Sequence, residues 1–151
     1  MSSVFNSAYE VSLRILFVLL ASDKPKSIDM ISAMDFISVY GRAFGIADVN
    51  LHGDNFYKYG EFSTRRTMVK KAIIVLIQKE MVDVYQRDDG YYYQINDAGE
   101  AYCESFKSDY AVEYAEAAKA ASVYTNNKSE REIFKEIISR STADLYGGYD
   151  G

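Results

Sequence analysis

The chain has 151 residues, of which 48% are hydrophobic and 26% are charged, a composition that supports one packed domain and argues against a disordered chain. Its 17 basic and 22 acidic side chains give a net charge of −5, which excludes a surface that is basic overall but allows a local basic patch. One cysteine and one histidine exclude an internal disulfide and a multi-cysteine zinc or iron–sulfur site. We therefore expect a protein that works through its surfaces.

Two helices are predicted at the N-terminal end. Ser7 and Glu10 have the spacing of a capping box, and the apolar residues that follow recur at helical spacing to about Ser22. Ser27 can cap a second helix that continues to Gly41. The apolar run at residues 15–21 is far shorter than the ~20 residues that span a membrane, and we predict no targeting signal at the N-terminus. We expect a cytoplasmic protein that does not contact a membrane.

The middle of the chain predicts a long loop, a helix and a β-hairpin. Residues 41–60 are rich in glycine and form a connection long enough to be functional or to dock on a partner. Ser63 can cap a third helix, over residues 63–79. The alternating sequence at residues 81–95, with Asp88-Asp89-Gly90 at its centre, is typical of a hairpin.

Helices are predicted again after the hairpin. Asp97 and Glu100 have a second capping-box spacing, which predicts one long helix that ends at Asn126-Asn127. Ser129 can cap a last helix to about Arg140. Aromatic residues four apart in the long helix indicate core packing, or alternatively a seam with a second chain; they are Tyr102, Phe106, Tyr110 and Tyr114.

This order of elements predicts a mainly α fold with one β-hairpin, namely a winged helix-turn-helix core with added C-terminal helices. A lone hairpin is marginally stable and must pack on neighbouring helices, so the order restricts the fold. We assign residues 1–96 to the winged-helix core and 97–140 to a C-terminal helical extension packed on or beside it. Residues 141–151 are expected to form a flexible tail that frays or waits for a partner.

The third predicted helix carries the strongest charge signal. Residues 57–79 hold six basic residues and one acidic residue, a net charge of +5. In a winged helix this element enters the major groove of DNA. The alternatives are a surface that faces a protein and a solvated face balanced by acidic neighbours. The candidate partner- or DNA-binding residues are Arg65, Arg66, Lys70, Lys71 and, in the hairpin, Arg87.

The predicted hairpin favours protein over DNA. Two carboxylates at its tip, Asp88 and Asp89, would repel phosphates, so any DNA contact should be weak. Tyr92 should lie on the strand face opposite Tyr91 and Tyr93, so that tyrosine is exposed on one face. Exposed tyrosines suit protein interfaces, although strands favour aromatic residues in any case. The interface candidates are Tyr57, Tyr59, Tyr91, Tyr92, Tyr93 and, in the long loop, His52.

The sequence does not favour an enzyme. His52 and Asp54 could act as a base and its orienting carboxylate, but a lone histidine in a glycine-containing loop is more often a structural hydrogen bonder. Cys103 falls inside a predicted helix, where a thiol behaves as a small apolar group. No glycine loop that cradles phosphate and no set of metal ligands is evident. We predict no catalytic residues, no metal and no other cofactor.

Several short motifs follow one another along the chain: Phe5-Asn6-Ser7, Leu13-Arg14-Ile15-Leu16, Met34-Asp35-Phe36, Tyr40-Gly41, Leu51-His52, Gly60-Glu61, Arg65-Arg66 and Gly90-Tyr91 with Tyr93. In this order and spacing they resemble the small middle components of bacterial ABC-three-component systems, a group that includes the small subunit of Lamassu-type defence. The likeness covers about Phe5 to Arg140, and it departs at Glu80-Met81, where a glycine and a leucine would be expected.

The resemblance implies a non-catalytic adaptor subunit. Such a subunit bridges an SMC- or Rad50-like ATPase and an effector, often a nuclease, in a complex that defends against phage or plasmid DNA. The residues alone leave two other hypotheses open. One is a winged-helix transcription regulator that reads DNA with the third helix, and the other is an enzyme built around His52.

Overall fold

The computed structural model describes residues 7–48, 51 and 58–150, with backbone alone for residues 58–61, 63 and 141–150. This part of the chain contains six helices and one two-stranded antiparallel hairpin, which confirms the mainly α fold with a single hairpin. In chain order the elements are α1 (Ala8–Leu20), α2 (Ile28–Val39), α3 (Lys58–Gln78), β1 (Val82–Arg87), β2 (Gly90–Ile95), α4 (Asp97–Glu104), α5 (Asp109–Thr125) and α6 (Glu130–Asp150).

The first two helices begin where the sequence predicts. The side-chain oxygen of Ser7 accepts a hydrogen bond from the Glu10 amide, and that of Ser27 accepts one from the Met30 amide, both at 3.1 Å. Each cap satisfies an amide that has no partner within its helix. The predicted starts of α1 and α2 are therefore confirmed.

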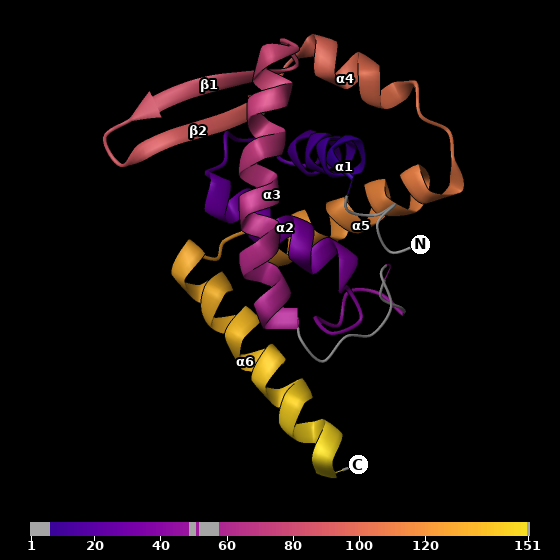
Figure 1. The fold of residues 1–151 in the computed structure, drawn as a ribbon, viewed down its shortest axis with the longest axis vertical. Coiled ribbons are helices and arrows are strands. Elements are labelled where there is room, and N and C mark those ends of the chain that lie inside the picture. The colour runs from indigo at the N-terminus through magenta and orange to yellow at the C-terminus, as the bar shows by residue number, and fades with distance from the viewer. Residues whose placement is uncertain (1–6, 49–50, 52–57, 151) are drawn as a thin grey trace.

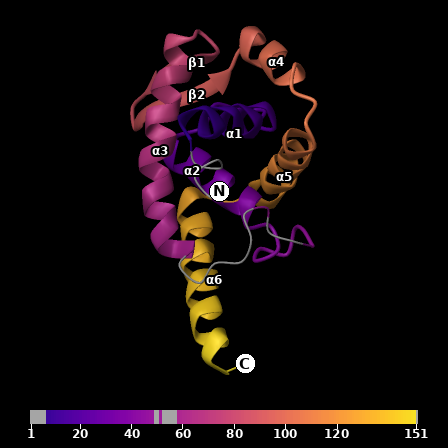
Figure 2. The ribbon, with the colours of Figure 1, turned by 45° about the vertical axis from the view of Figure 1, so that its right-hand side comes forward.

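Helix α2 is the centre of the fold, and α1, α3, α5 and α6 pack around it (Figures 1 and 2). Every residue from Met30 to Tyr40 is buried. A helix that is apolar on all sides must be covered on all sides. Its two buried serines donate back to carbonyls one turn earlier, Ser32 to Ile28 and Ser38 to Met34. The remaining polar side chain in this run, Asp35, is taken up below.

The hairpin projects from the helical body, with β2 beside the helices and β1 on the far side (Figure 1). Its two-residue turn, Asp88-Asp89, lies between the paired residues Arg87 and Gly90. Gly90 has a φ of +135°, which a residue with a side chain rarely adopts. An antiparallel bridge between Lys26 and Tyr93 fixes the middle of β2 to the connection between α1 and α2.

Helix α3 begins at Lys58, so the prediction that Ser63 caps it is wrong. The first turns are held by tertiary contacts instead. The ring of Phe62 lies 5.4 Å from that of Phe36 on α2 and 5.7 Å from that of Phe134 on α6. These apolar contacts outweigh the capping preference of a serine inside the helix.

The single long helix predicted after the hairpin is also wrong, because the chain leaves the helix at residues 105–108 and re-enters as α5. Ser108 caps α5 by accepting from the Ala111 amide at 3.2 Å. The four aromatic residues that were predicted to form one stripe are divided between the two helices and the turn, and all pack on the core. Their interpretation as core residues is confirmed.

Helix α6 has the predicted cap and a different end. Ser129 accepts from the Glu132 amide at 3.1 Å, and the Glu132 carboxylate accepts from the Ser129 amide at 3.2 Å, a complete capping box. The helix continues to Asp150 instead of ending near Arg140 and extends away from the body (Figure 2). The flexibility of residues 141–151 stays a prediction.

Candidate functional site

One buried carboxylate joins four helices. Asp35 on α2 accepts from Arg14 Nε of α1 at 3.0 Å, from Arg65 Nη1 of α3 at 3.0 Å and from the Tyr114 hydroxyl of α5 at 2.5 Å. Each of these four residues is at most 2% exposed. Arg65 also lies over the Tyr40 ring, with 5.9 Å from its Cζ to the ring centroid. We call Asp35, Arg14, Arg65 and Tyr114 the Asp35 cluster.

The electrostatics of this cluster favour a charged Asp35. Burial alone would raise the pKa of its carboxyl group, but Arg14 and Arg65, together with the Tyr114 hydrogen bond, outweigh burial and lower the pKa to about 2. Burial would likewise lower the pKa of Arg14, and the Asp35 charge reverses this and raises it. Burial and the Asp35 charge raise the pKa of Tyr114 well above its usual value. The cluster is therefore a fixed ion-pair network, a structural device in the core.

This geometry corrects the prediction for Arg65. The sequence places Arg65 among the exposed basic residues that bind a partner or DNA, whereas its side chain is 2% exposed and paired with Asp35. Because a helix turns by about 100° per residue, Arg65 and Arg66 point in different directions. Arg65 faces the core and Arg66 faces solvent. Charge reversal at Arg65 would therefore disrupt the core and not a surface contact.

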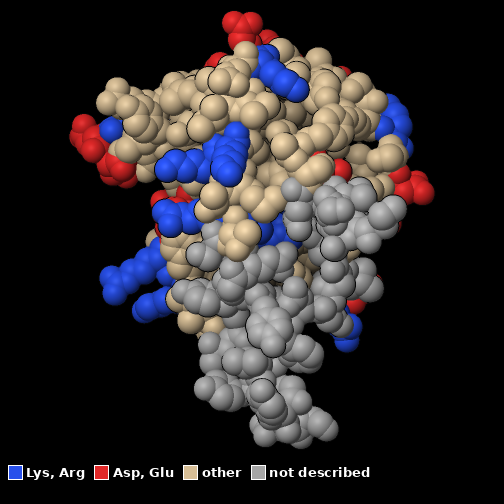
Figure 3. Space-filling view, in the orientation of Figure 1, with Lys and Arg blue, Asp and Glu red and all other residues tan. Residues whose placement is uncertain are grey.

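The other basic side chains described on α3 and directly after it lie on two sides of the helix. Arg66 and Lys70 border an open hollow of about 360 Å³, together with Ile28 and Thr67. Arg66 Nε also lies 2.5 Å from an Asp29 carboxylate oxygen, in an ion pair that is partly exposed. Figure 3 shows basic side chains gathered beside α3 and acidic side chains at the tip of the hairpin. We call Arg66, Thr67 and Lys70 the α2-side basic surface.

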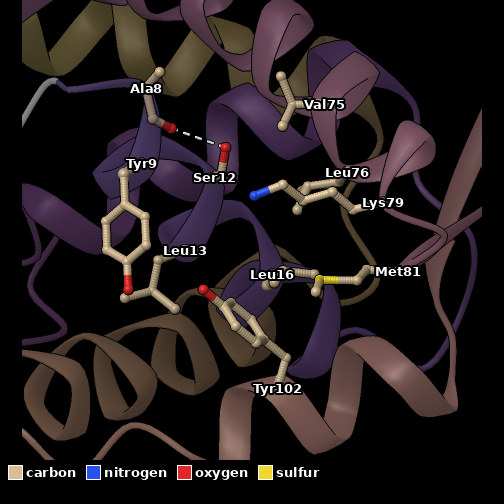
Figure 4. Close-up of a pocket in the computed structure, with 10 residues that line it drawn as sticks. All are labelled: Ala8, Tyr9, Ser12, Leu13, Leu16, Val75, Leu76, Lys79, Met81 and Tyr102. Carbon is tan, nitrogen blue, oxygen red and sulfur yellow. Dashed lines mark hydrogen bonds between the residues drawn. The ribbon is translucent and has the colours of Figure 1, made fainter.

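On the other side, α3 and α1 enclose an apolar groove that the sequence analysis missed. Two adjoining hollows of about 200 Å³ each share Ala8 and Val75 and have Lys71 and Lys79 among their lining residues. Figure 4 shows the hollow at the C-terminal end of α3, where Tyr9, Tyr102 and Lys79 surround an apolar floor. Tyr9 is 55% exposed there. We call these two hollows the α1/α3 groove; its lining residues are Ala8, Tyr9, Val11, Ser12, Leu13, Leu16, Met68, Lys71, Ala72, Val75, Leu76, Lys79, Met81 and Tyr102.

The hairpin tyrosines divide between two faces as predicted. Tyr91 is exposed and Tyr93 packs against the core, on the face that also carries Val84. Tyr92 lies on the opposite face, where its hydroxyl donates to Asp89 at 2.6 Å. The Arg87 guanidinium stacks over the Tyr92 ring at 4.5 Å. The Arg87 guanidinium and the Asp89 carboxylate thus both contact Tyr92 at the tip of the hairpin, and the expectation that the hairpin makes at most a weak DNA contact stays a prediction.

For three of the candidate interface residues, the structure describes no side-chain contacts. His52 and Tyr57 lie outside the described residues, and for Tyr59 only the backbone position in α3 is described. Their roles, and the pairing of His52 with Asp54, stay predictions. Burial raises the pKa of the Cys103 thiol to about 11, so this group stays protonated near neutral pH. Among the described residues, no group of three or more His, Cys, Asp or Glu side chains is placed to hold a metal ion.

A search of the described residues finds no helix with the length and apolar character needed to cross a membrane. Comparison with known proteins gives one match. A family model described as "ABC-three component (ABC-3C) system Middle Component 2" matches residues 4–146. No curated protein matches the chain, and no solved structure does.

Replacing Asp35 by asparagine should destabilise the fold by about 3–5 kcal/mol, because two buried guanidinium groups would lose their counter-charge. The matched control is Asp29→Asn, which removes the partly exposed partner of Arg66 and should cost less than about 1 kcal/mol. Urea unfolding followed by circular dichroism measures both. Equal losses for the two variants would contradict the role assigned to the Asp35 cluster.

The Asp35 cluster should also make stability depend on pH in acid. The pKa of Asp35 is lowered in the folded state, so the unfolded chain takes up a proton first, and stability falls as the pH drops from about 4 to about 2. The loss should be on the order of 2 kcal/mol. In Tyr114→Phe the pKa of Asp35 should rise, so this acid-dependent loss should become smaller. Urea midpoints at several pH values test this, and an unchanged slope in the variant would contradict it.

Proposed function

The chain belongs to the middle component 2 family of ABC-three-component systems, and we propose that it acts there as a non-catalytic adaptor subunit. The family match, which spans residues 4–146, is the observation that carries this proposal. It confirms the resemblance to middle components seen in the short sequence motifs. We further propose that the system is a Lamassu-type defence against phage or plasmid DNA in the bacterial cytoplasm.

We propose that the first partner is an SMC- or Rad50-like ATPase and the second an effector, often a nuclease, which the adaptor bridges. The three N-terminal helices, the hairpin and the bridge at Lys26 support a winged-helix core, since they follow one another in the order of that fold. Winged helices serve both as DNA readers and as protein adaptors, so the surfaces must decide between the two roles.

The α1/α3 groove is the surface that best supports a protein partner. It combines an apolar floor with Lys71 and Lys79 at its sides, and Tyr9 and Tyr102 line it. Tyrosine gives an interface much buried area together with a polar tip. The two lysines suit a partner segment that carries acidic side chains among apolar ones. Contacts by Arg87 and by the exposed tyrosines of the hairpin stay predictions.

Duplex binding is the second candidate function, and the α2-side basic surface is the observation that favours it. Arg66 and Lys70 lie on one side of α3, next to an open hollow that a phosphate group could enter. The basic surface that DNA could contact is smaller than the sequence predicts, because Arg65 is buried and Arg66 is already paired with Asp29. The buried position of Arg65 and the acidic hairpin tip both argue against tight, sequence-specific reading.

The adaptor role predicts that Lys71→Glu combined with Lys79→Glu prevents assembly without unfolding the chain, since both residues are exposed on the groove. The tagged chain is co-expressed with the products of the two neighbouring genes, and the recovered ATPase is quantified by mass spectrometry. Recovery should fall at least about tenfold, because two charge pairs become repulsive. The control, Lys107→Glu with Lys119→Glu, makes the same change of charge at exposed sites outside the groove. A wild-type chain that recovers no ATPase would contradict the proposal.

Weak duplex contact predicts a shallow dependence of affinity on salt. Neutralising about two phosphates gives a slope near −2 in a plot of log affinity against log salt concentration. Arg66→Glu with Lys70→Glu should abolish this binding, whereas Lys71→Glu with Lys79→Glu should weaken it less. Fluorescence anisotropy with a labelled duplex measures both. A steep slope, with nanomolar affinity for one sequence, would instead support the transcription regulator.

A further inference from the structure

Strand β1 is an open sheet edge. Within the described part of the chain, β1 pairs with β2 and with no other strand, and it lies on the outer side of the hairpin (Figure 1). All residues from Asp83 to Arg87 are exposed. Val84 and Tyr85 are each 43% exposed, although both have side chains that favour burial. An exposed edge of this kind is a template for pairing with another strand.

The register of the hairpin determines which backbone groups of β1 face outward. The main chain of Tyr93 exchanges two hydrogen bonds with Lys26, at 2.8 and 2.9 Å, so its N–H and C=O point away from β1. Val84 lies opposite Tyr93 and must therefore point its own N–H and C=O away from β2. Because this direction alternates along a strand, Gln86 also presents its backbone groups at the outer edge.

We propose that this edge pairs with the same edge of a second copy of the chain. The two β1 strands run antiparallel, with the twofold axis at Tyr85. Val84 then exchanges backbone hydrogen bonds with Gln86 of the second copy. Asp83 lies opposite Arg87 of the second copy, and the reverse pair repeats across the axis. The product is a four-stranded antiparallel sheet in place of two two-stranded hairpins, each of which has an open edge.

Charge complementarity selects this register over the others that the edge allows. An axis at Asp83 would place that carboxylate against itself, and an axis at Gln86 would place Asp83 against Asp89. An axis at Val84 leaves Asp83 and Arg87 without opposite charges across the pair. With the axis at Tyr85, both charged side chains of β1 meet an opposite charge. Opposite-charge pairs across strands stabilise a sheet, and like charges destabilise it.

This inference does not rest on the proposed function. It concerns the chain alone, so self-association is measured on the purified protein, and recovery of the ATPase is measured separately. Either result can fail while the other holds.

Disulfide trapping tests the position of the axis. Side chains on a twofold axis in a non-hydrogen-bonded pair have Cβ atoms about 4.5–5.5 Å apart, close enough for a disulfide to form with a small adjustment. Tyr85→Cys should therefore give a covalent dimer under mild oxidation. The matched control is Tyr92→Cys, on the same face but on the inner strand. It should stay monomeric, as should the wild-type chain, whose one cysteine, Cys103, is buried. Equal trapping of Tyr85→Cys and Tyr92→Cys would overturn the proposal.

A charge swap tests the pairing of Asp83 with Arg87. Sedimentation equilibrium should show that Asp83→Arg and Arg87→Asp each weaken dimerisation at least about tenfold, since each creates two like-charge pairs. The double variant should restore the affinity, because every pair is again opposite in charge. Circular dichroism checks that the variants are folded. A wild-type chain that stays monomeric at all concentrations, or a double variant that does not recover, would overturn the proposal.

Discussion

The fold depends on one buried carboxylate, that of Asp35, and on the side chains that pair with it. Asp35 is the one buried carboxylate of α2 among the described residues, and it is stable there because Arg14, Arg65 and Tyr114 surround it. Removing an unpaired charge from water costs far more than a typical protein's net stability, so each partner must be in place when the core forms. The four side chains come from α1, α2, α3 and α5. Their shared hydrogen bonds thus fix the rotation of each helix about its own axis.

The rotation of α3 that the Asp35 cluster fixes determines where the basic side chains of this helix lie on the surface. With Arg65 turned inward, Arg66 and Lys70 lie toward α2, and Lys71 and Lys79 lie toward α1. A basic segment that looks continuous in the sequence becomes two separate surfaces with different neighbours. One adjoins an ion pair and an open hollow, whereas the other adjoins an apolar groove. The core ion pair and the surface chemistry are consequently linked through the rotation of a single helix.

Local signals in the sequence were sufficient for several elements. The capping residues Ser7, Ser27 and Ser129 and the alternation around Asp88-Asp89-Gly90 predict their elements because each depends on near neighbours. The start of α3 could not be predicted this way, since it depends on rings that are distant in the sequence. Helical spacing also continued across residues 105–108 and hid the cap at Ser108.

The burial of Arg65 could have been predicted from a different feature of the sequence, namely charged residues within apolar helices. Asp35 and Arg14 each interrupt a strongly apolar helix, and a buried ion requires an opposite charge from elsewhere in the chain. Arg65 is one of the basic residues that could supply this counter-charge, and it would then be expected in the core. The α1/α3 groove offered no such signal, because it forms only when two helices that are distant in the sequence lie side by side.

The bridge between Lys26 and Tyr93 limits the number of strands that can be added to the hairpin. It occupies the middle of the outer side of β2, which leaves β1 as the one long edge of the hairpin in the described part of the chain. A sheet that can be extended on one side only forms a closed pair, because each chain has then used its free edge. In the proposed pairing, the same tether that holds the hairpin to the body therefore limits the extended sheet to two chains.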